Sequence, residues 1–122
     1  MTISVLAIDD SRTMRDLVRL TLEGDGMAVT LAEDGVAGVE AFQAGRFDAV
    51  ITDINMPRMD GFGVIEALRK GGRNRRVPIL VLTTESGTEL KQRARNSGAT
   101  GWIVKPFDGP ALVGVLRRVT GG

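Results

Sequence analysis

The sequence of 122 residues contains no cysteine and no histidine. Without cysteine there can be no disulfide framework, no thiolate metal site and no thiol nucleophile. Without histidine, no imidazole of this chain can act as a general base, a metal ligand or a carrier of a phosphoryl group. The absence of cysteine is also compatible with a reducing cytoplasm.

Excess charge and long apolar runs are absent as well. The formal net charge is +1 at pH 7, which gives no reason to expect binding to nucleic acid or to a membrane surface. No apolar stretch approaches the roughly 20 residues that span a bilayer, and the first residues lack the charged start of a signal peptide. We therefore expect a cytoplasmic protein whose partners are neither nucleic acid nor membrane.

The composition is that of an ordinary globular protein. Hydrophobic residues make up 43% and charged residues 25% of the chain. The length is close to the usual size of one domain, and no stretch rich in proline, glycine or serine is long enough to separate two domains. We predict a single domain over residues 1–122.

Short apolar runs alternate with longer segments along the chain. The runs are rich in valine, isoleucine and leucine and lie at about 3–8, 27–32, 48–52, 78–83 and 100–104. Five strands that alternate with five helices predict an α/β fold with a parallel sheet. Residues 49–52 and 79–82 are continuously apolar, as expected for strands that are covered on both faces.

The intervening segments carry helix signals of unequal strength. Aspartate favours the position before a helix, and Asp34, Asp60 and Asp108 precede the second, third and fifth segments. The fourth segment follows Ser86 and has few apolar residues. The side chains predicted to face the core are, helix by helix, Met14, Leu17, Val18, Thr21 and Leu22; Val36, Val39 and Phe42; Phe62, Ile65 and Leu68; Leu90 and Ala94; Leu112, Val115, Leu116 and Val119.

Polar side chains stand where four of the predicted strands end. Asp9 and Asp10 follow the first strand, Asp53 follows the third, Thr83 ends the fourth and Lys105 follows the fifth. In parallel sheets the carboxyl ends of the strands lie at one edge, and ligands bind there. We therefore expect three carboxylates and one ammonium group to converge.

Each of these residues has a purely structural role as an alternative. Asp9 and Asp10 either start a helix or place two carboxylates around a hard cation such as Mg²⁺. Asp53 is either a loop cap or a carboxylate that accepts a phosphoryl group. Thr83 either ends a strand or donates its hydroxyl to a phosphoryl oxygen. Lys105 is either an exposed strand end or brings its charge to Asp53.

Together these residues identify a family. The chain resembles a response-regulator receiver domain over essentially its full length, through Asp9-Asp10, Asp53, Thr83 and the segment Lys105-Pro106-Phe107. The resemblance implies a flavodoxin-like, CheY-like fold, in which a doubly wound sheet of five strands in the order 2-1-3-4-5 is flanked by five helices.

The resemblance also implies a role for each residue of the site. Asp53 would be phosphorylated by a histidine kinase, and Lys105 would contact the phosphoryl group. Asp9, Asp10, Asp53 and the backbone carbonyl of Asn55 would bind Mg²⁺. The protein would be a signalling switch that assists its own phosphorylation and dephosphorylation, rather than an enzyme.

A second group of residues would relay the signal. By resemblance, Thr83 would move toward the phosphoryl group and Trp102 would rotate inward, at a position where many members of the family have tyrosine or phenylalanine. The fourth helix, the fifth strand and the fifth helix would form the output face. The pair Asn55 and Glu85 goes with short-lived phosphorylation in this family.

Within the family the chain is most similar to single-domain chemotaxis regulators of the CheY type, in segments 9–15, 83–86 and 101–107. That likeness implies a CheA-like kinase as donor and a flagellar motor switch protein as target of a monomer. The sequence ends at Gly122 without an output domain, so we expect it to act by binding a partner.

Two other functions stay open. A single-domain receiver outside motor control could serve as a phosphorelay shuttle or as a phosphate sink. A small phosphohydrolase of the haloacid-dehalogenase type would also use a strand-end aspartate, a threonine, a lysine and Mg²⁺. Such an enzyme needs a second acid two residues after its nucleophile, where this chain has Asn55.

Overall fold

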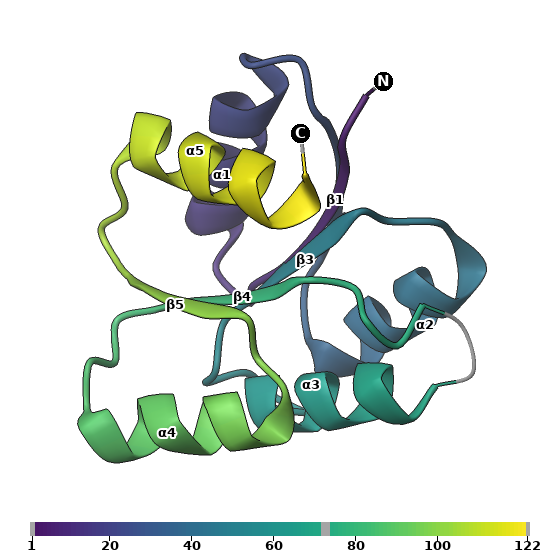
Figure 1. The fold of residues 1–122 in the computed structure, drawn as a ribbon, viewed down its shortest axis with the longest axis vertical. Coiled ribbons are helices and arrows are strands. Elements are labelled where there is room, and N and C mark those ends of the chain that lie inside the picture. Colours follow the sequence, from purple (N-terminus) through teal and green to yellow (C-terminus); the bar gives the residue numbers. More distant parts are fainter. Residues whose placement is uncertain (1, 72–73, 122) are drawn as a thin grey trace.

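Within residues 2–71 and 74–121, which the computed structural model describes, five parallel strands form one sheet in the order β2-β1-β3-β4-β5 (Figure 1). The strands are β1 Ser4–Ile8, β2 Ala28–Ala32, β3 Ala49–Thr52, β4 Ile79–Thr83 and β5 Gly101–Val104. Each neighbouring pair is parallel. The predicted α/β fold and its strand order are therefore confirmed.

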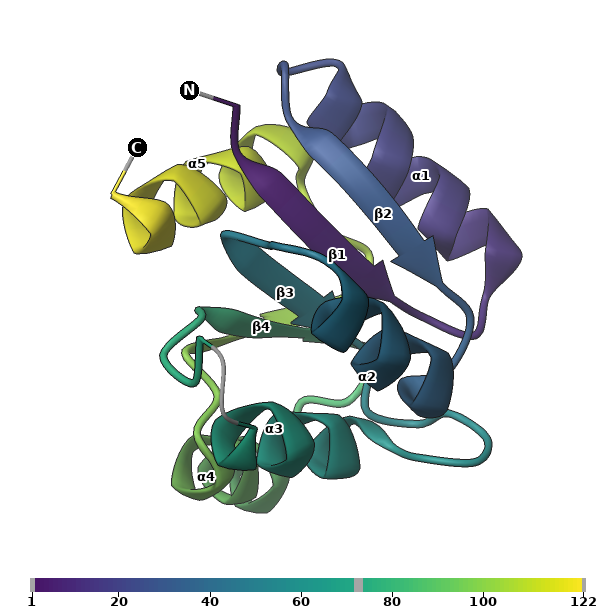
Figure 2. The same cartoon turned by 90° about the vertical axis from the view of Figure 1, so that its right-hand side faces the viewer.

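The five helices of the described residues cover both faces of this sheet (Figure 2). They are α1 Arg12–Glu23, α2 Gly35–Ala44, α3 Gly61–Lys70, α4 Thr88–Ser97 and α5 Gly109–Thr120. Helices α1 and α5 pack on one face, and α2, α3 and α4 pack on the other. No helix in residues 2–71 or 74–121 combines the length and the apolar character that crossing a bilayer requires.

The core has two apolar layers, one on each face of the sheet. Successive residues of a strand point to opposite faces, so Leu6 and Ile8 of β1 join one layer, whereas Val5 and Ala7 join the other. Every residue of β3 and β4 is buried, as their continuous apolar runs predicted. Polar side chains of these central strands can therefore gather only at the strand ends.

The three predicted helix-start aspartates are confirmed. Asp34 accepts a hydrogen bond from the Ala37 N–H, Asp60 from the Gly63 N–H and Asp108 from the Ala111 N–H. This contact satisfies a backbone donor that the first turn of a helix leaves unpaired.

Helix α4 is held unequally at its two ends. It starts later than predicted, after Gly87, which has no side chain to cap it. At the other end, the Arg69 guanidinium of α3 donates to the Gly98 carbonyl at 3.0 and 2.8 Å, and to the Val77 carbonyl at 2.7 Å. Gly98 has a φ of 115°, which a residue with a Cβ rarely adopts. The firm contact thus lies at the end of α4 remote from the carboxyl ends of the strands.

Two predictions of inward-facing residues were wrong in detail. Leu17 of α1 is 46% exposed, because it lies at the border of the stripe that Val18 and Leu22 bury. In α2, Phe42 is buried as predicted and Val39 packs against the core, but Val36 is only partly buried, and Gly35 and Gly38 are buried as well. A Cβ on Gly38 would lie 2.4 Å from Ile8 Cδ1. Helix α2 therefore approaches the sheet too closely for larger side chains at that point.

Candidate functional site

Lys105 joins the loops that follow β1 and β3. Its Nζ donates to Asp9 Oδ2 at 2.8 Å and to Asp53 Oδ2 at 2.9 Å. The Lys105 side chain is only 9% exposed, and both aspartates are buried. The alternative of an exposed lysine at a strand end is therefore wrong, and the expected convergence at the carboxyl edge of the sheet is observed.

The acidic residues form a cluster of oxygen ligands. Asp9, Asp10 and Asp53 each offer a carboxylate oxygen, and these oxygens lie within 4.8 Å of one another. Asp10 is exposed, whereas the other two are buried. Mg²⁺ prefers a few carboxylates together with water and phosphate oxygens, so this donor set fits that ion. A bound cation would compete with Lys105 for the same carboxylates.

Burial and ion pairing act in opposite directions on the ionisable groups of the cluster. Burial raises the pKa of Asp9 above its usual range, although hydrogen bonds from Lys105 and from the Ser11 N–H lower it in part. Burial alone would lower the pKa of Lys105, but the hydrogen bonds and charges of Asp9 and Asp53 outweigh it and raise the pKa. The ammonium group therefore stays charged between the two carboxylates.

The backbone fixes Asp53 from several directions. Its N–H donates to the Ile8 carbonyl of β1 at 3.0 Å, and its carbonyl accepts the Thr52 hydroxyl at 2.9 Å. Its own Oδ1 accepts the Ile54 N–H at 2.6 Å. The other oxygen, Oδ2, is directed at Lys105. The carboxylate thus has one oxygen held by the main chain and one facing the cation.

Asp9 is held in a similar way, with help from Arg15, a residue whose role the sequence did not indicate. Its Oδ1 accepts the Ser11 N–H at 2.9 Å, and its carbonyl accepts Arg15 Nη1 at 2.7 Å. Ser11, rather than Asp9 or Asp10, is the N-cap of α1. The two aspartates are therefore left for the acidic cluster.

A second group of contacts links this site to β5. Thr83 is fully buried at the end of β4, and its hydroxyl accepts the Glu85 N–H at 3.3 Å. The Glu85 carboxylate accepts from the Asn55 amide at 3.4 Å. The Glu85 carbonyl accepts from Trp102 Nε1 at 2.9 Å. Glu85 thus contacts the loop after β3 with its side chain and β5 with its backbone.

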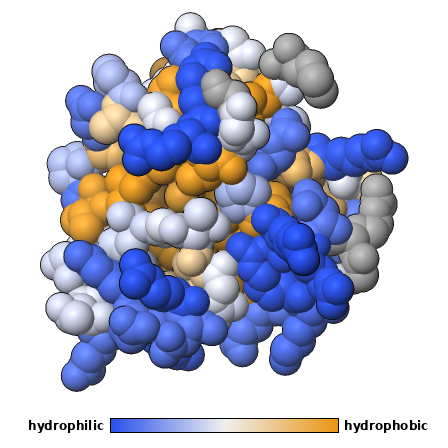
Figure 3. All heavy atoms as spheres, viewed as in Figure 1, coloured by the Kyte–Doolittle hydropathy of each residue, from blue (hydrophilic) through white to orange (hydrophobic). Residues whose placement is uncertain are grey.

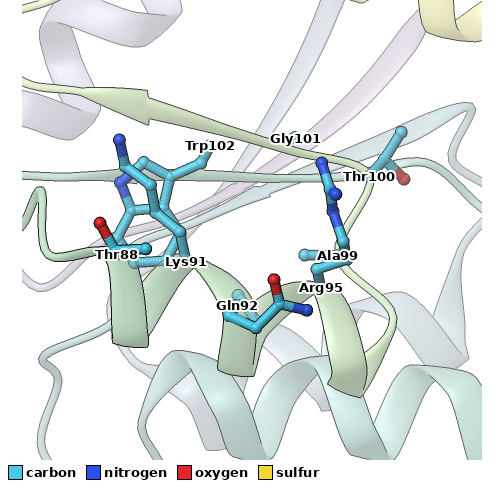
Figure 4. Close-up of a pocket in the computed structure, with 9 residues that line it drawn as sticks. Thr88, Lys91, Gln92, Arg95, Ala99, Thr100, Gly101 and Trp102 are labelled. Carbon is cyan, nitrogen blue, oxygen red and sulfur yellow. The ribbon is translucent and has the colours of Figure 1, made fainter.

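Trp102 also lines a groove between α4 and β5 (Figure 4). The indole is partly buried and packs against the core layer under α2, α3 and α4. Polar and basic side chains of α4 form the other wall of the groove. Its lining includes Thr88, Lys91, Gln92 and Arg95 of α4 and Gly101 and Trp102 of β5.

Comparison with known proteins agrees with this geometry. A family model described as the response regulator receiver domain matches residues 5–117. The response regulator MprA of Mycobacterium ulcerans is 37% identical over 119 residues, which are 98% of this chain and 49% of that protein. The chain thus spans about half the length of the curated relatives it matches.

Solved structures share the fold. Chemotaxis protein CheY4 of Vibrio cholerae has a TM-score of 0.93 and 44% identity, over 98% of this chain and 99% of that chain. The receiver domain of sensor histidine kinase PA1611 from Pseudomonas aeruginosa has a TM-score of 0.91 and 27% identity, over 100% of both chains. That structure has a magnesium ion coordinated in its active site cleft.

Proposed function

This chain belongs to the response regulator receiver domain family, and on that premise we propose that Asp53 is its phosphoryl acceptor and that the reaction needs Mg²⁺. Receiver domains act in two-component systems, where they take phosphoryl groups from histidine kinases and serve as signalling domains rather than classical enzymes. One observation carries the proposal. The Asp53 carboxylate lies between the Ile54 N–H and the Lys105 ammonium group, beside two further carboxylates.

The transfer step follows from these contacts. An oxygen of Asp53 attacks the phosphorus of a phosphohistidine on the kinase. The P–N bond breaks as the new P–O bond forms, and the imidazole leaves with the bonding electron pair. The Ile54 N–H orients the carboxylate. Lys105, already within 2.9 Å of Asp53, supplies positive charge to the phosphoryl oxygens once they arrive.

The acidic cluster supplies the metal ligands in this proposal. Asp9, Asp10, Asp53 and the backbone carbonyl of Asn55 would hold Mg²⁺. When bound, the ion would offset the charge of the phosphoryl oxygens. The all-oxygen donor set of the three aspartates supports this assignment.

The output route begins at Thr83. Its hydroxyl accepts the Glu85 N–H, which leaves the hydroxyl proton available for donation. If the Thr83 side chain moves to donate that proton to a phosphoryl oxygen, its contact with Glu85 is displaced, and with it the loop whose carbonyl holds the Trp102 indole. The affected surface is α4, β5 and α5. Hydrophobic residues gather across the middle of this surface, above the hydrophilic α4 (Figure 3), and Val104 of β5 is 39% exposed.

For the biological role we favour control of motility. The match to CheY4 covers 98% of this chain and 99% of that chain, so the two chains correspond over nearly their full lengths. A CheA-like kinase, a flagellar motor switch protein as target, a monomeric state and a cytoplasmic location all remain predictions. So does a single domain over residues 1–122.

The MprA relatives support a second candidate, the receiver part of a longer response regulator, because the chain covers only half of their length. A phosphorelay shuttle or phosphate sink would share the same site. The haloacid-dehalogenase alternative is disfavoured, because Asn55 has an amide where that chemistry needs an acid. This amide contacts Glu85.

Intact mass tests the acceptor. The protein is mixed with acetyl phosphate and Mg²⁺, beside a sample without Mg²⁺ and beside Asp53→Asn. We expect one phosphoryl adduct that needs the metal and is absent from the variant. An adduct on Asp53→Asn, or none on the wild type after rapid quenching, would reject Asp53. Onward transfer to a histidine phosphotransfer domain would favour the shuttle, and turnover of p-nitrophenyl phosphate would revive the hydrolase.

A further inference from the structure

Gly61, the first residue of α3, lies directly against the backbone of Asp53. Its N–H donates to the Ile54 carbonyl at 2.8 Å. A Cβ at this position would lie 2.2 Å from the Asp53 carbonyl oxygen and 2.9 Å from Ile54 Cα. Gly61 is itself buried, so a side chain could not turn away into solvent. Helix α3 therefore begins as close to the peptide between residues 53 and 54 as atoms allow.

That peptide controls the direction of the Asp53 carboxylate. The Ile54 N–H, which belongs to it, holds Oδ1 at 2.6 Å. On the other side, Asp53 N–H is tied to Ile8 of β1. The peptide is thus confined between the sheet and the first turn of α3. A group that pushes on the Asp53 carbonyl must move the Ile54 N–H and, with it, the oxygen that this N–H holds.

We propose that Gly61 is a positioning residue for the phosphoryl acceptor: its missing side chain lets α3 support the peptide that aims Asp53 at Lys105 and at the acidic cluster. This inference rests on the proposed role of Asp53. The position requires glycine, because a Cβ would collide with backbone atoms of Asp53 and Ile54. Backbone cannot move aside as the end of a flexible side chain can.

The chain offers a matched control. A Cβ on Gly35 would lie 2.3 Å from the Met59 carbonyl oxygen, which is also backbone. Gly35 starts α2, as Gly61 starts α3. The loop it would push is the same one that follows β3, but at Met59, beyond the contacts of Asp53. Gly35→Ala should therefore cost comparable stability without turning the carboxylate.

The experiment compares Gly61→Ala and Gly35→Ala with the wild type. Three quantities are measured: the Ile54 amide resonance without metal, the dissociation constant for Mg²⁺ by calorimetry, and the rate of phosphorylation by acetyl phosphate. For Gly61→Ala we expect a displaced Ile54 resonance. We also expect the dissociation constant for Mg²⁺ to rise on the order of 10-fold or more, which is the usual effect of removing a group that supports a metal ligand. Phosphorylation should slow in parallel. For Gly35→Ala we expect the wild-type values.

A folded Gly61→Ala with unchanged resonance and Mg²⁺ affinity would overturn the proposal, and so would equal changes in both variants. If Gly61→Ala does not fold, Asp60→Ala replaces it. Asp60 is exposed and caps the first turn of α3 through the Gly63 N–H at 2.8 Å, so its loss loosens the same support without adding an atom. A smaller displacement of the Ile54 resonance is then expected, and its absence would reject the support by α3.

These readouts separate the two proposals. If the wild type takes no phosphoryl group, the proposed function fails. The Ile54 resonance and the Mg²⁺ affinity still report whether Gly61 positions Asp53.

Discussion

The indole Nε1–H of Trp102 donates a hydrogen bond to the backbone carbonyl of Glu85 at 2.9 Å. This bond joins β5 to the loop between β4 and α4. The same Glu85 gives its N–H to the Thr83 hydroxyl. An event that draws Thr83 toward Asp53 therefore acts on the residue that anchors the indole.

Phosphorylation should change the fluorescence of Trp102. It is the only tryptophan of the sequence, so the signal has one source. The emission spectrum is recorded before and after addition of acetyl phosphate with Mg²⁺. We expect a change in the wild type and none in Asp53→Asn under the same conditions. A wild-type spectrum that stays constant, while mass spectrometry shows the adduct, would disconnect Trp102 from the acceptor.

Lys105→Met should destabilise the protein, and Mg²⁺ should restore the loss. Without Lys105, Asp9 and Asp53 face each other without a counter-ion. Removing one partner of a buried pair costs up to about 3–5 kcal/mol. Urea unfolding with and without Mg²⁺ measures the effect, and Mg²⁺ should raise the stability of the variant more than that of the wild type. Equal Mg²⁺ effects on both proteins would show that the metal does not replace the ammonium charge.

The ion pair between Asp34 and Arg58 should make stability depend on pH in the acid range. Arg58 donates to both carboxylate oxygens of Asp34, at 2.8 and 3.0 Å. The hydrogen bonds from Arg58 and from the Ala37 N–H hold the pKa of Asp34 below its usual range. A lowered carboxyl pKa stabilises the fold above the unfolded value of about 3.9, and that stabilisation is lost as the pH falls through the folded value.

Thermal unfolding of Arg58→Asn between neutral pH and strong acid tests this dependence. Asparagine tolerates the left-handed backbone at this position, where φ is 67°. We expect the variant to melt below the wild type at neutral pH and the difference to shrink in strong acid. Arg19→Gln is the control, since Arg19 and Glu23 are half-exposed and 4.0 Å apart, and such pairs contribute little. A difference that is constant with pH would assign the loss to packing instead.

The phosphorylated state should be short-lived. By its family resemblance the pair Asn55 and Glu85 goes with fast loss of the phosphoryl group, and the two side chains meet at the site in this structure. Decay of the adduct after removal of the donor, followed by mass at neutral pH with Mg²⁺, gives the lifetime. A lifetime of hours would contradict the prediction. Glu85→Ala, which removes the contact but keeps the backbone bond to Trp102, should alter the decay.

The fold followed from a pattern that is local in sequence. Apolar runs of strand length, separated by helical segments, are enough to indicate a parallel sheet, because strands buried on both faces have no polar positions. Strand ends then place Asp9, Asp53 and Lys105 at one edge, whatever the connecting loops contain. The order of the strands came from the family resemblance, since alternation alone does not order a sheet.

The remaining contacts depend on how loops and helices approach each other, which no local pattern encodes. Arg15 reaches the Asp9 carbonyl from the first turn of α1, which follows the N-cap Ser11. Arg58 pairs with Asp34 across 24 residues of sequence. The burial of α2 through Gly38 was missed for the same reason, because it depends on the distance between a helix and the sheet.

The unequal attachment of α4 has a mechanical consequence. Arg69 ties the carboxyl end of the helix to α3 through Gly98, whereas the amino end, near Thr83, has no side-chain cap. A displacement at the uncapped amino end of α4 would therefore rotate the helix about its tied carboxyl end. A small shift at Thr83 would thus tilt α4 against β5, and the groove beside Trp102 would widen or narrow most at its end nearest the acceptor.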